Sequence, residues 1–366
     1  MHTIRFLGTD KTEKDFGIAL RKNVNDYFKS NGLSTKANAQ MVIKTFVMTA
    51  IYIVPYIILL TIPLNIYIAL ALTVLMGIGI AGVGMGVMHD ACHSSYSKKK
   101  WVNDFLGGSL YLLGSNVLNW KIQHNVLHHT YTNISGLDED IDSKGPIRLA
   151  EKKPYKPYQR FQYIYAFLFY GLMTLSILVT DFIRLSRYDK AGLVKSQNKT
   201  AGPEFVKMIF RKIIYLAVIL GLPIWLTDFT WYQVLIGFFV MHWVASIILS
   251  FVFQMAHVVE GADQPLENGD LKTDWYVHQL KTTSDFARNN KILGWYVGGL
   301  NFQIEHHLFP NICHIHYPKI APIVERTAKE FGIPYNLKST LSDAFLSHIK
   351  RLKELGRPTL KYHSNV

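Results

Sequence analysis

Charged residues are scarce in this sequence, and two long stretches lack them almost entirely. Asp, Glu, Lys and Arg make up only 18% of the 366 residues, whereas 49% are hydrophobic. A coiled coil needs far more charge and a disordered chain far less hydrophobic content, so both classes are excluded. Cysteine is scarce too, because Cys92 and Cys313 are the only two, which is too few for a disulfide-stapled secreted domain.

The first stretch runs from Thr45 to Met88 and contains no Asp, Glu, Lys, Arg or His. As a helix, its 44 residues would be about 66 Å long, roughly twice the thickness of a bilayer's hydrocarbon core. Its natural break is the segment IPLN at 62–65, which favours a tight turn. The stretch therefore predicts two membrane-spanning helices, at about 45–62 and 66–88.

The second stretch, 213–256, has Asp228 as its only Asp, Glu, Lys or Arg. The neighbouring aromatic residues Trp225, Trp231 and Tyr232 suit a membrane–water interface. We therefore expect two more spans, at about 209–227 and 231–255, that turn at Asp228. The predicted fold class is an all-α integral membrane protein with four transmembrane helices in two hairpins.

The basic residues give these helices an orientation. The turns at Pro63 and Asp228 contain no Lys or Arg, and all 39 such residues lie before the first span, within 89–212 or after 256. The positive-inside rule places those three regions, and with them both termini, in the cytoplasm. The net charge of +13 then needs only anionic membrane lipid as its counterpart, and not nucleic acid. The first 40 residues lack the apolar core of a signal peptide.

Two further apolar segments complicate the count of spans. Residues 105–118 are too few to cross a bilayer, whereas 161–180 are enough. If 161–180 crossed alone, however, histidine groups discussed below would lie on opposite sides of the membrane. We therefore expect both segments to be interfacial or re-entrant parts of a cytoplasmic helical cap. The predicted organisation is a cytoplasmic N-terminal segment (1–40), one catalytic domain (41–330) and a charged cytoplasmic tail (331–366).

Histidines gather just outside the predicted spans, on the cytoplasmic side. They form a pair in HDACH (89–93), a trio in HNVLHH (124–129) and a pair in QIEHH (303–307), and His257 follows the last span. One His-x-x-x-His pair would be weak support for a metal site, but three groups on the same side of the membrane are much stronger. The eight histidines are too many for one ion and suit two. The predicted ligands are His89, His93, His124, His128, His129, His257, His306 and His307.

Carboxylates near these histidines have a different expected role. The Glu-x-x-His pairs of soluble di-iron carboxylate proteins do not occur here. We expect the nearby acidic residues to accept hydrogen bonds that fix the histidine tautomers. The candidates are Asp90, Asp138, Asp140, Glu260 and Glu305.

The remaining histidines are expected to be structural. His242, inside the last span, should be buried with its hydrogen bonds satisfied. His278 could lie near the site, and His314 and His316 could support it. His348 and His363 are interpreted as surface or structural residues. The glycine pattern at 77–82 matches a dinucleotide-binding fingerprint, but it lies in a predicted span without a preceding strand and instead fits helix packing.

Together these segments resemble the three histidine boxes of the membrane-bound fatty acid desaturases. The matching text is HDACH at 89–93, HNVLHH with TYTNISGLDEDID at 124–142, and NFQIEHHLFPNICHIHYP at 301–318. Gln303 stands where many relatives have histidine, a form typical of front-end desaturases and their bacterial relatives. Gln303 would then be a weak ligand or, like Asp90 and Glu305, a hydrogen-bond partner of the ligands.

The resemblance implies a cytoplasmic non-haem di-iron centre, held by the eight histidines, that uses O₂ to insert a double bond into a fatty acyl chain. The acyl-CoA or acyl-lipid substrate would place its tail in an apolar tunnel. Many front-end relatives carry a fused cytochrome b5 domain with a His-Pro motif, but no His-Pro dipeptide occurs here. We therefore expect a separate electron donor of the ferredoxin, flavodoxin or cytochrome b5 type, and a bacterial inner membrane rather than the endoplasmic reticulum.

Two alternatives remain open at this point. The same centre could serve a hydroxylase, or a desaturase of a sterol, carotenoid or sphingoid lipid. A more remote alternative is a metal-ion transporter with cytoplasmic histidine sensors, although the spans contain few ionisable residues to form a path.

Overall fold

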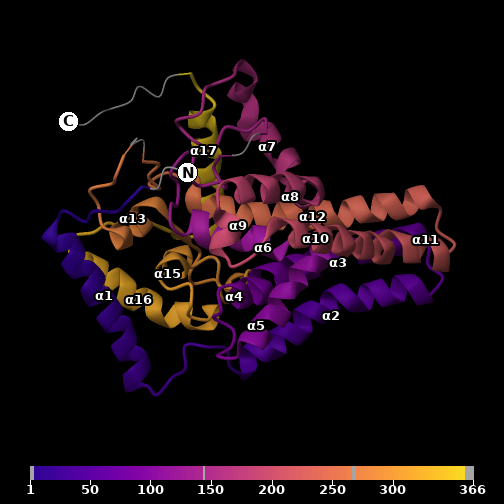
Figure 1. The fold of residues 1–366 in the computed structure, drawn as a ribbon, viewed down its shortest axis with the longest axis horizontal. Coiled ribbons are helices and arrows are strands. Elements are labelled where there is room, and N and C mark those ends of the chain that lie inside the picture. The colour runs from indigo at the N-terminus through magenta and orange to yellow at the C-terminus, as the bar shows by residue number, and fades with distance from the viewer. Residues whose placement is uncertain (1–3, 143–144, 266–268, 359–366) are drawn as a thin grey trace.

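Four long apolar helical stretches dominate the computed structural model, which describes residues 4–142, 145–265 and 269–358 (Figure 1). The stretches that are long and apolar enough to cross a membrane are Ala39–Thr61, Ile66–Cys92, Ala201–Leu226 and Trp231–His257. They match the four helices expected from the sequence. Each continues past the charge-free run at one end, because a helix ends at its cap rather than where hydrophobicity stops.

The first two long helices pack against each other and are joined by a tight turn. Helix α2 (Ala39–Thr61) is followed by α3 (Ile66–Gly82), which continues through the π-helix η1 (Val83–Met88) into α4 (His89–Cys92). Asn65 explains where α3 begins, because its side chain accepts hydrogen bonds from the first N–H groups of the helix.

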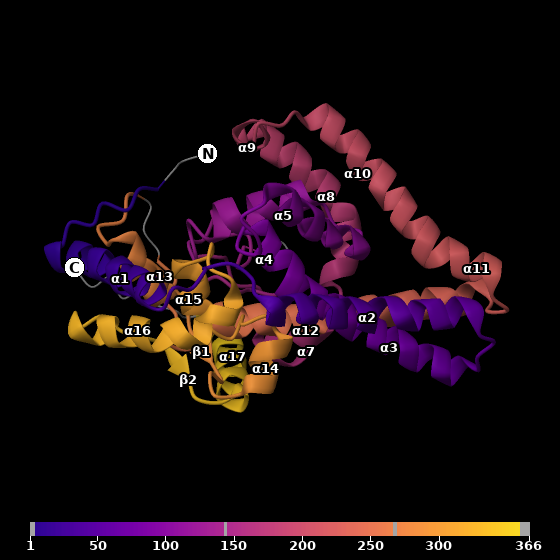
Figure 2. The ribbon, with the colours of Figure 1, turned by 90° about the horizontal axis from the view of Figure 1, so that it is seen from below.

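The other two apolar stretches also follow each other closely. Helix α10 (Ala201–Leu216), the π-helix η5 (Ala217–Gly221) and α11 (Leu222–Leu226) precede α12 (Trp231–His257). Thr230 and Gln233 form a capping box that starts α12. Helix α12 packs along α3, and all these helices extend to one side of the molecule (Figures 1 and 2). Their outer side chains suit lipid, since Phe46 is 72% exposed and Trp225 79%.

The remaining elements gather around the other end of the long helices (Figures 1 and 2). We call them the histidine-bearing region, because His124, His128, His306 and His307 lie on them. They are mostly short helices joined by irregular loops. In chain order they are α1 (Lys11–Ser30), α5 (Lys100–Gly107), η2 (Gly108–Leu113), α6 (Val117–Trp120), η3 (Lys121–His128), η4 (Pro157–Phe161), α7 (Gln162–Tyr170), α8 (Met173–Lys190), α9 (Leu193–Ser196), α13 (Trp275–Thr282), β1 (Asp285–Phe286), α14 (Lys291–Tyr296), α15 (Gln303–Leu308), η6 (His314–His316), α16 (Tyr317–Glu330), β2 (Leu337–Lys338) and α17 (Leu341–Leu355).

The two apolar segments outside the four long helices are both broken. Residues 161–180 divide into α7 and α8, and the helical halves on either side of Gly171 meet at 85°. A side chain at Gly171 would collide with the indole of Trp243 on α12, so glycine permits the bend to pack closely. Residues 105–118 span the end of α5, the 3₁₀ helix η2 and the start of α6, with Gly114 in the left-handed conformation between them.

Both ends of the described chain pack onto the histidine-bearing region. Helix α1 buries Phe16 and Leu20 against α13 and α16. At the other end, β2 pairs in parallel with β1, and α17 packs on α7 and α12. His348 of α17 is consequently buried rather than on the surface, where it bonds to the Tyr170 hydroxyl at 3.0 Å and to the Val258 carbonyl at 2.8 Å.

A buried ion pair ties α10 to the segment that carries the second histidine group. The Lys212 ammonium donates to Asp181 of α8 at 2.9 Å and to the Gly114 carbonyl at 2.7 Å. Asp181 in turn accepts from the side-chain amide of Asn119 at 3.0 Å. Both charges are almost fully buried, at 9% and 1% side-chain exposure, so neither can be solvated if its partner is lost.

We predict that Lys212→Met destabilises the protein strongly, by about 3–5 kcal/mol, because it leaves the Asp181 carboxylate buried without its counter-charge. Thermal unfolding in detergent, followed by tryptophan fluorescence, measures the effect. Adding Asp181→Asn should restore much of the loss. As a control, Lys22→Met removes a lysine from an exposed pair with Asp26, in which both side chains are more than half exposed, and it should shift the midpoint little. Equal shifts for both single variants would contradict this interpretation.

Candidate metal centre

The first histidine group lies where an apolar helix ends. Residues 83–88 form the π-helix η1, and the N–H of His89 donates to the carbonyl of Gly84, five residues earlier. The following turn, α4, begins at His89 and is capped by His93, and the ring centroids of these two histidines lie 4.8 Å apart. Single π-helical turns, which contain one residue more than an α-helical turn, occur frequently at functional sites.

The second group lies in another π-helix, η3. Its register differs from the i,i+4 spacing that the sequence suggests, because the N–H of His129 bonds to the carbonyl of His124 at 3.0 Å. This five-residue turn brings the rings of those two residues together, with their Nε2 atoms 3.2 Å apart. His128 then points toward a different set of neighbours.

The remaining members come from distant parts of the chain. His257 is the last residue of α12, and α15 carries His306 and His307. Helix α15 is entirely buried, and the Asp285 carboxylate accepts the N–H of Ile304 at 2.9 Å, which anchors its first turn.

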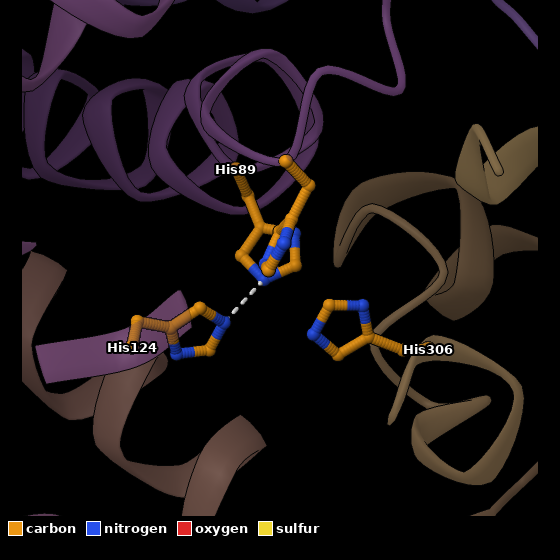
Figure 3. Close-up of side chains that lie close together, drawn as sticks. His89, His124 and His306 are labelled. Carbon is orange, nitrogen blue, oxygen red and sulfur yellow. Dashed lines mark hydrogen bonds between the residues drawn. The ribbon is translucent and has the colours of Figure 1, made fainter. Parts of the chain in front are cut away.

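All eight predicted histidines converge on two adjacent groups of ring nitrogens. His89, His93, His124 and His306 form one group, and His128, His257 and His307 form the other. Within each group the ligand atoms lie within 4.8 Å of one another. His129 lies between them and makes a third set with His306 and His307. Figure 3 shows the rings of His89, His124 and His306 turned toward a shared space from three separate segments.

The direction of the ring nitrogens fits metal binding. Four histidines have a buried Nε2 atom without a hydrogen-bond partner among the described residues: His93, His128, His257 and His307. Leaving a buried polar atom unpaired costs about 1–3 kcal/mol, so this number at one place calls for ligands. The Nδ1 atoms of His128, His257 and His307 face protein acceptors instead, and that of His307 lies 2.9 Å from the Gln279 side-chain oxygen. A histidine that binds a metal typically directs one ring nitrogen at the metal and hydrogen-bonds the other to the surrounding protein, as these histidines do with Nε2 and Nδ1.

Electrostatics divides the histidines into two kinds. Burial, reinforced by neighbouring histidines, lowers the pKa values of His124, His129 and His307 well below the ordinary value, so these rings are neutral and able to ligate. Burial also acts to lower the pKa of His128, but the carboxylates of Asp138 and Asp140 outweigh it and raise that pKa to about 9. The same carboxylates make His128 a more basic ligand.

Asp138 is the main support of His128. Its carboxylate lies 3.0 Å from Nδ1 of His128 and also accepts the backbone N–H groups of Asn133 at 2.8 Å and Asp140 at 3.0 Å. These three donors hold the carboxylate in one orientation. Of the five candidate carboxylates, Asp138 and Asp140 are the two that lie within 4 Å of a nitrogen of one of the eight predicted ligands in the described part of the chain.

The other candidate acceptors have different partners. Asp90 binds His314, with its carboxylate 2.9 Å from Nδ1, and accepts from the Cys313 thiol. Glu305 accepts from the Tyr335 hydroxyl at 2.9 Å, and burial raises the pKa of Glu305 well above its ordinary value. Glu260 lies 3.5 Å from Lys350 near the surface. The Gln303 amide nitrogen is buried without a partner.

Reasoning from sequence missed Gln279 and Thr132. The Gln279 side-chain oxygen accepts from both Thr132 and His307, and its amide donates to the His129 carbonyl at 3.2 Å. Their neighbour His278 was expected near the site, and it donates to the Thr132 carbonyl at 2.9 Å. Neither residue belongs to a recognisable motif, so the only signal in the sequence was that Gln279 directly follows His278.

The remaining histidines have protein partners. His242 lies between the hydroxyls of Thr174 at 2.8 Å and Tyr215 at 2.6 Å, as expected for a satisfied buried histidine. His314 bridges Asp90 and the Lys44 ammonium, and His316 donates to the Lys36 carbonyl at 3.2 Å. His363 lies outside the described residues.

A cavity of about 800 Å³ reaches the first histidine group. His89 and His124 line it together with Trp120, whose ring stacks on His124 at 4.5 Å. Its apolar walls include Leu110 and Leu113 of η2 and Leu249 and Phe253 of α12. Its charged lining residues include Glu139 and Asp140 and, from α8, Arg184 and Arg187, both of which pair with Glu139. The shape and lining suit a molecule with a long apolar tail and a polar end.

Comparison with known proteins agrees with this site. The family model described as "Fatty acid desaturase" matches residues 65–339. The sn-1 linoleoyl-lipid 6-desaturase of Arthrospira platensis is 34% identical over 349 residues, which cover 93% of this chain and 92% of that protein. The corresponding enzyme of Synechocystis is 31% identical over 94% of this chain and 96% of its own length. An acyl-lipid (8-3)-desaturase of Physcomitrium patens is 34% identical over 95% of this chain and 73% of its own.

The matched region contains every histidine of the two groups, and the relatives are similar along almost the whole chain. The protein is therefore an oxidoreductase that belongs to the fatty acid desaturase family.

Proposed function

We propose that this protein is an O₂-dependent fatty acyl desaturase that inserts a double bond into a lipid-bound acyl chain with electrons from a separate carrier. The proposal rests on one observation: an acyl-sized cavity and a cluster of buried histidines lie next to each other. A cavity of acyl dimensions, apolar toward one end, opens onto His89 and His124. Those two residues belong to a buried cluster of histidines whose free nitrogens converge.

The proposed cofactor is a pair of non-haem iron ions. His89, His93, His124 and His306 would hold one, His128, His257 and His307 would hold the other, and His129 lies where it could serve either. When bound, such a centre supplies the oxidising power to remove hydrogen from an unactivated methylene, which no acid or base side chain can do. Gln303, close to both groups in sequence, is proposed as a weak or indirect ligand.

The protein's own residues hold the acyl chain and keep water away. Trp120 and Phe253 flank the ring of His124, at 4.5 and 6.2 Å between centroids, and form the apolar wall nearest the cluster. A chain lying along this wall would present its methylenes to His89 and His124 while its carbonyl end lies toward Glu139 and Arg187. Asp138 retains the proton on Nδ1 of His128, so that Nε2 stays free to ligate.

We also propose the membrane arrangement expected from the sequence. The four apolar stretches would span a bacterial inner membrane as two hairpins, and α7 and α8 would lie at its interface. The histidine-bearing region and both termini would lie on the cytoplasmic side. The electron donor would be a soluble ferredoxin, flavodoxin or cytochrome b5-type protein. The turns after α2 and α11, which contain no Lys or Arg, would face the other side.

We predict that His128→Ala lowers the iron content of the purified protein to at most about half and abolishes desaturation, because its Nε2 is one of the unpaired atoms of the second group. Elemental analysis gives the iron content. Gas chromatography of fatty acids, after incubation with a reduced carrier, O₂ and acyl-lipid, gives the activity. His316→Ala is the matched control, since that ring contacts a backbone carbonyl outside the cluster and its loss should preserve both values. Full activity of His128→Ala would refute the ligand assignment.

Asp138→Asn should leave the protein folded but reduce activity or iron affinity by roughly 10–100-fold, the usual effect of losing a carboxylate behind a ligating histidine. An amide offers one acceptor oxygen to the three donors that Asp138 now satisfies. Iron titration and kcat at saturating substrate separate the two effects. Asp104→Asn, at an exposed carboxylate, is the control and should change neither. Unchanged kinetics in both variants would contradict the role of Asp138.

Cysteine labelling can test the membrane orientation with little background, because Cys92 and Cys313 are both buried. In inner-membrane vesicles and in intact spheroplasts, a cysteine at Asp228 should react with an impermeant maleimide only from the outer side. Cysteines at Lys11 and Lys350 should react only from the cytoplasmic side. Labelling of Asp228 and Lys350 from the same side would overturn the proposed arrangement.

A further inference from the structure

A glutamine on the cavity wall has a buried amide oxygen without a partner in the described part of the chain. Four residues of α12 line the cavity: Leu249, Ser250, Phe253 and Gln254. They share one face of the helix, because they form two pairs that are each one turn apart. The Ser250 hydroxyl donates to the Tyr170 carbonyl at 3.3 Å, whereas the side-chain oxygen of Gln254 has no hydrogen bond. An unpaired amide at the wall of a cavity calls for a polar group in the ligand.

One other residue of the described lining has a buried polar atom without a partner, Thr180 of α8. A threonine in a helix can satisfy its hydroxyl locally, because rotation about χ1 brings it to a carbonyl three or four residues earlier. A glutamine does not readily make such local bonds. Gln254 therefore depends on whatever occupies the cavity, and Thr180 does not.

The order of residues along α12 places Gln254 relative to the histidines. Gly84, one π-helical turn before the first histidine group, lies close to Leu249, since a side-chain carbon at Gly84 would be 3.8 Å from it. One turn further along α12, the Phe253 ring lies 6.2 Å from the ring of His124. Gln254 comes last on this wall. The wall thus runs from an apolar part, past the first histidine group, to an amide.

We propose that the Gln254 amide binds the carbonyl of the acyl ester and thereby sets the position of the new double bond. The proposal rests on the proposed function, since it assigns the register of the acyl chain in that same cavity. A hydrocarbon tail offers no hydrogen-bonding group, so the ester is the part of the chain that can satisfy the amide. A half-turn of the terminal amide exchanges its oxygen for its NH₂ group, which donates to a carbonyl.

A fixed carbonyl fixes the number of carbons that reach the metal centre. With the carbonyl at Gln254 and the tail directed toward Leu249, the chain passes Phe253 and His124 at a constant distance from its ester. Without this hydrogen bond the apolar wall would hold the chain equally well in several registers, because hydrophobic contact is not directional. Gln254 is therefore a positioning residue for regioselectivity.

Binding tests the hydrogen bond without turnover when the electron donor is left out. Quenching of tryptophan fluorescence can report occupancy, because Trp120 lines the cavity. Wild type should bind methyl decanoate about 5-fold more tightly than 1-methoxydecane, which lacks the carbonyl. Gln254→Leu replaces an unpaired amide by an apolar group of similar size, so it should keep the fold but bind both probes equally. Ser250→Ala, whose lost hydroxyl bonds to a backbone carbonyl, is the matched control and should keep the preference.

The position of the double bond is the second measurement, made by mass spectrometry of dimethyl disulfide adducts of the products. Iron-loaded wild type and Ser250→Ala should each give one positional isomer, and Gln254→Leu should give a mixture. No preference for the ester in the wild type, which would mean that water alone satisfies the amide, would overturn the proposal, as would a single unchanged isomer from Gln254→Leu. If the wild type desaturates no acyl lipid, the proposed function fails, whereas the ester preference still decides whether Gln254 binds a carbonyl.

Discussion

Buried imidazole nitrogens that face one another, four of them without a hydrogen-bond partner among the described residues, are the constraint on which the rest of this structure depends. Protonated rings would repel one another, so the cluster favours neutral rings, except at His128, where Asp138 and Asp140 raise the pKa. Helix α15, whose residues are all buried, packs on α13 and α16 and helps to exclude solvent from the cluster. Neutrality follows from burial and from the neighbouring histidines, which lower the pKa values of His124, His129, His306 and His307.

The two π-helices are the local device that meets this constraint. An α-helix places residues 124 and 128 on one face, so a regular helix would direct both toward the same neighbours. The five-residue turn in η3 instead brings His124 against His129, while His128, whose ring also stacks on that of His124, lies with His257 and His307. One short segment can therefore supply both groups. In η1 the same kind of turn ends the apolar helix with His89 facing the cavity.

Charge distribution and histidine spacing allowed the four apolar helices and the eight converging histidines to be predicted, because both patterns are local in the sequence. The division of the histidines into two groups could not be predicted, since it depends on a π-helical register that hydrophobicity does not encode. Asp138 was among the five carboxylates expected to support the histidines, but the sequence could not single it out: Asp90 and Glu305 lie directly beside predicted ligands in sequence, yet Asp138, ten residues from His128, makes the contact. The bend at Gly171 depends on Trp243 of a distant helix. Each of these features depends on a backbone register or on a contact between separate segments, which local patterns of residue type do not encode.

The two histidine groups are not equivalent with respect to the cavity. Among the described lining residues are His89 and His124 of the first group but none of His128, His257 and His307. The second group is instead the one supported by Asp138 and Gln279. A carboxylate that raises ligand basicity would also bind water strongly, and it is harmless to an apolar substrate only if it lies away from the chain. Asp140 marks the boundary, because it lines the polar end of the cavity and approaches His128 at 3.4 Å. The fold thus separates the part of the cluster that lines the cavity from the part that is tuned by charge.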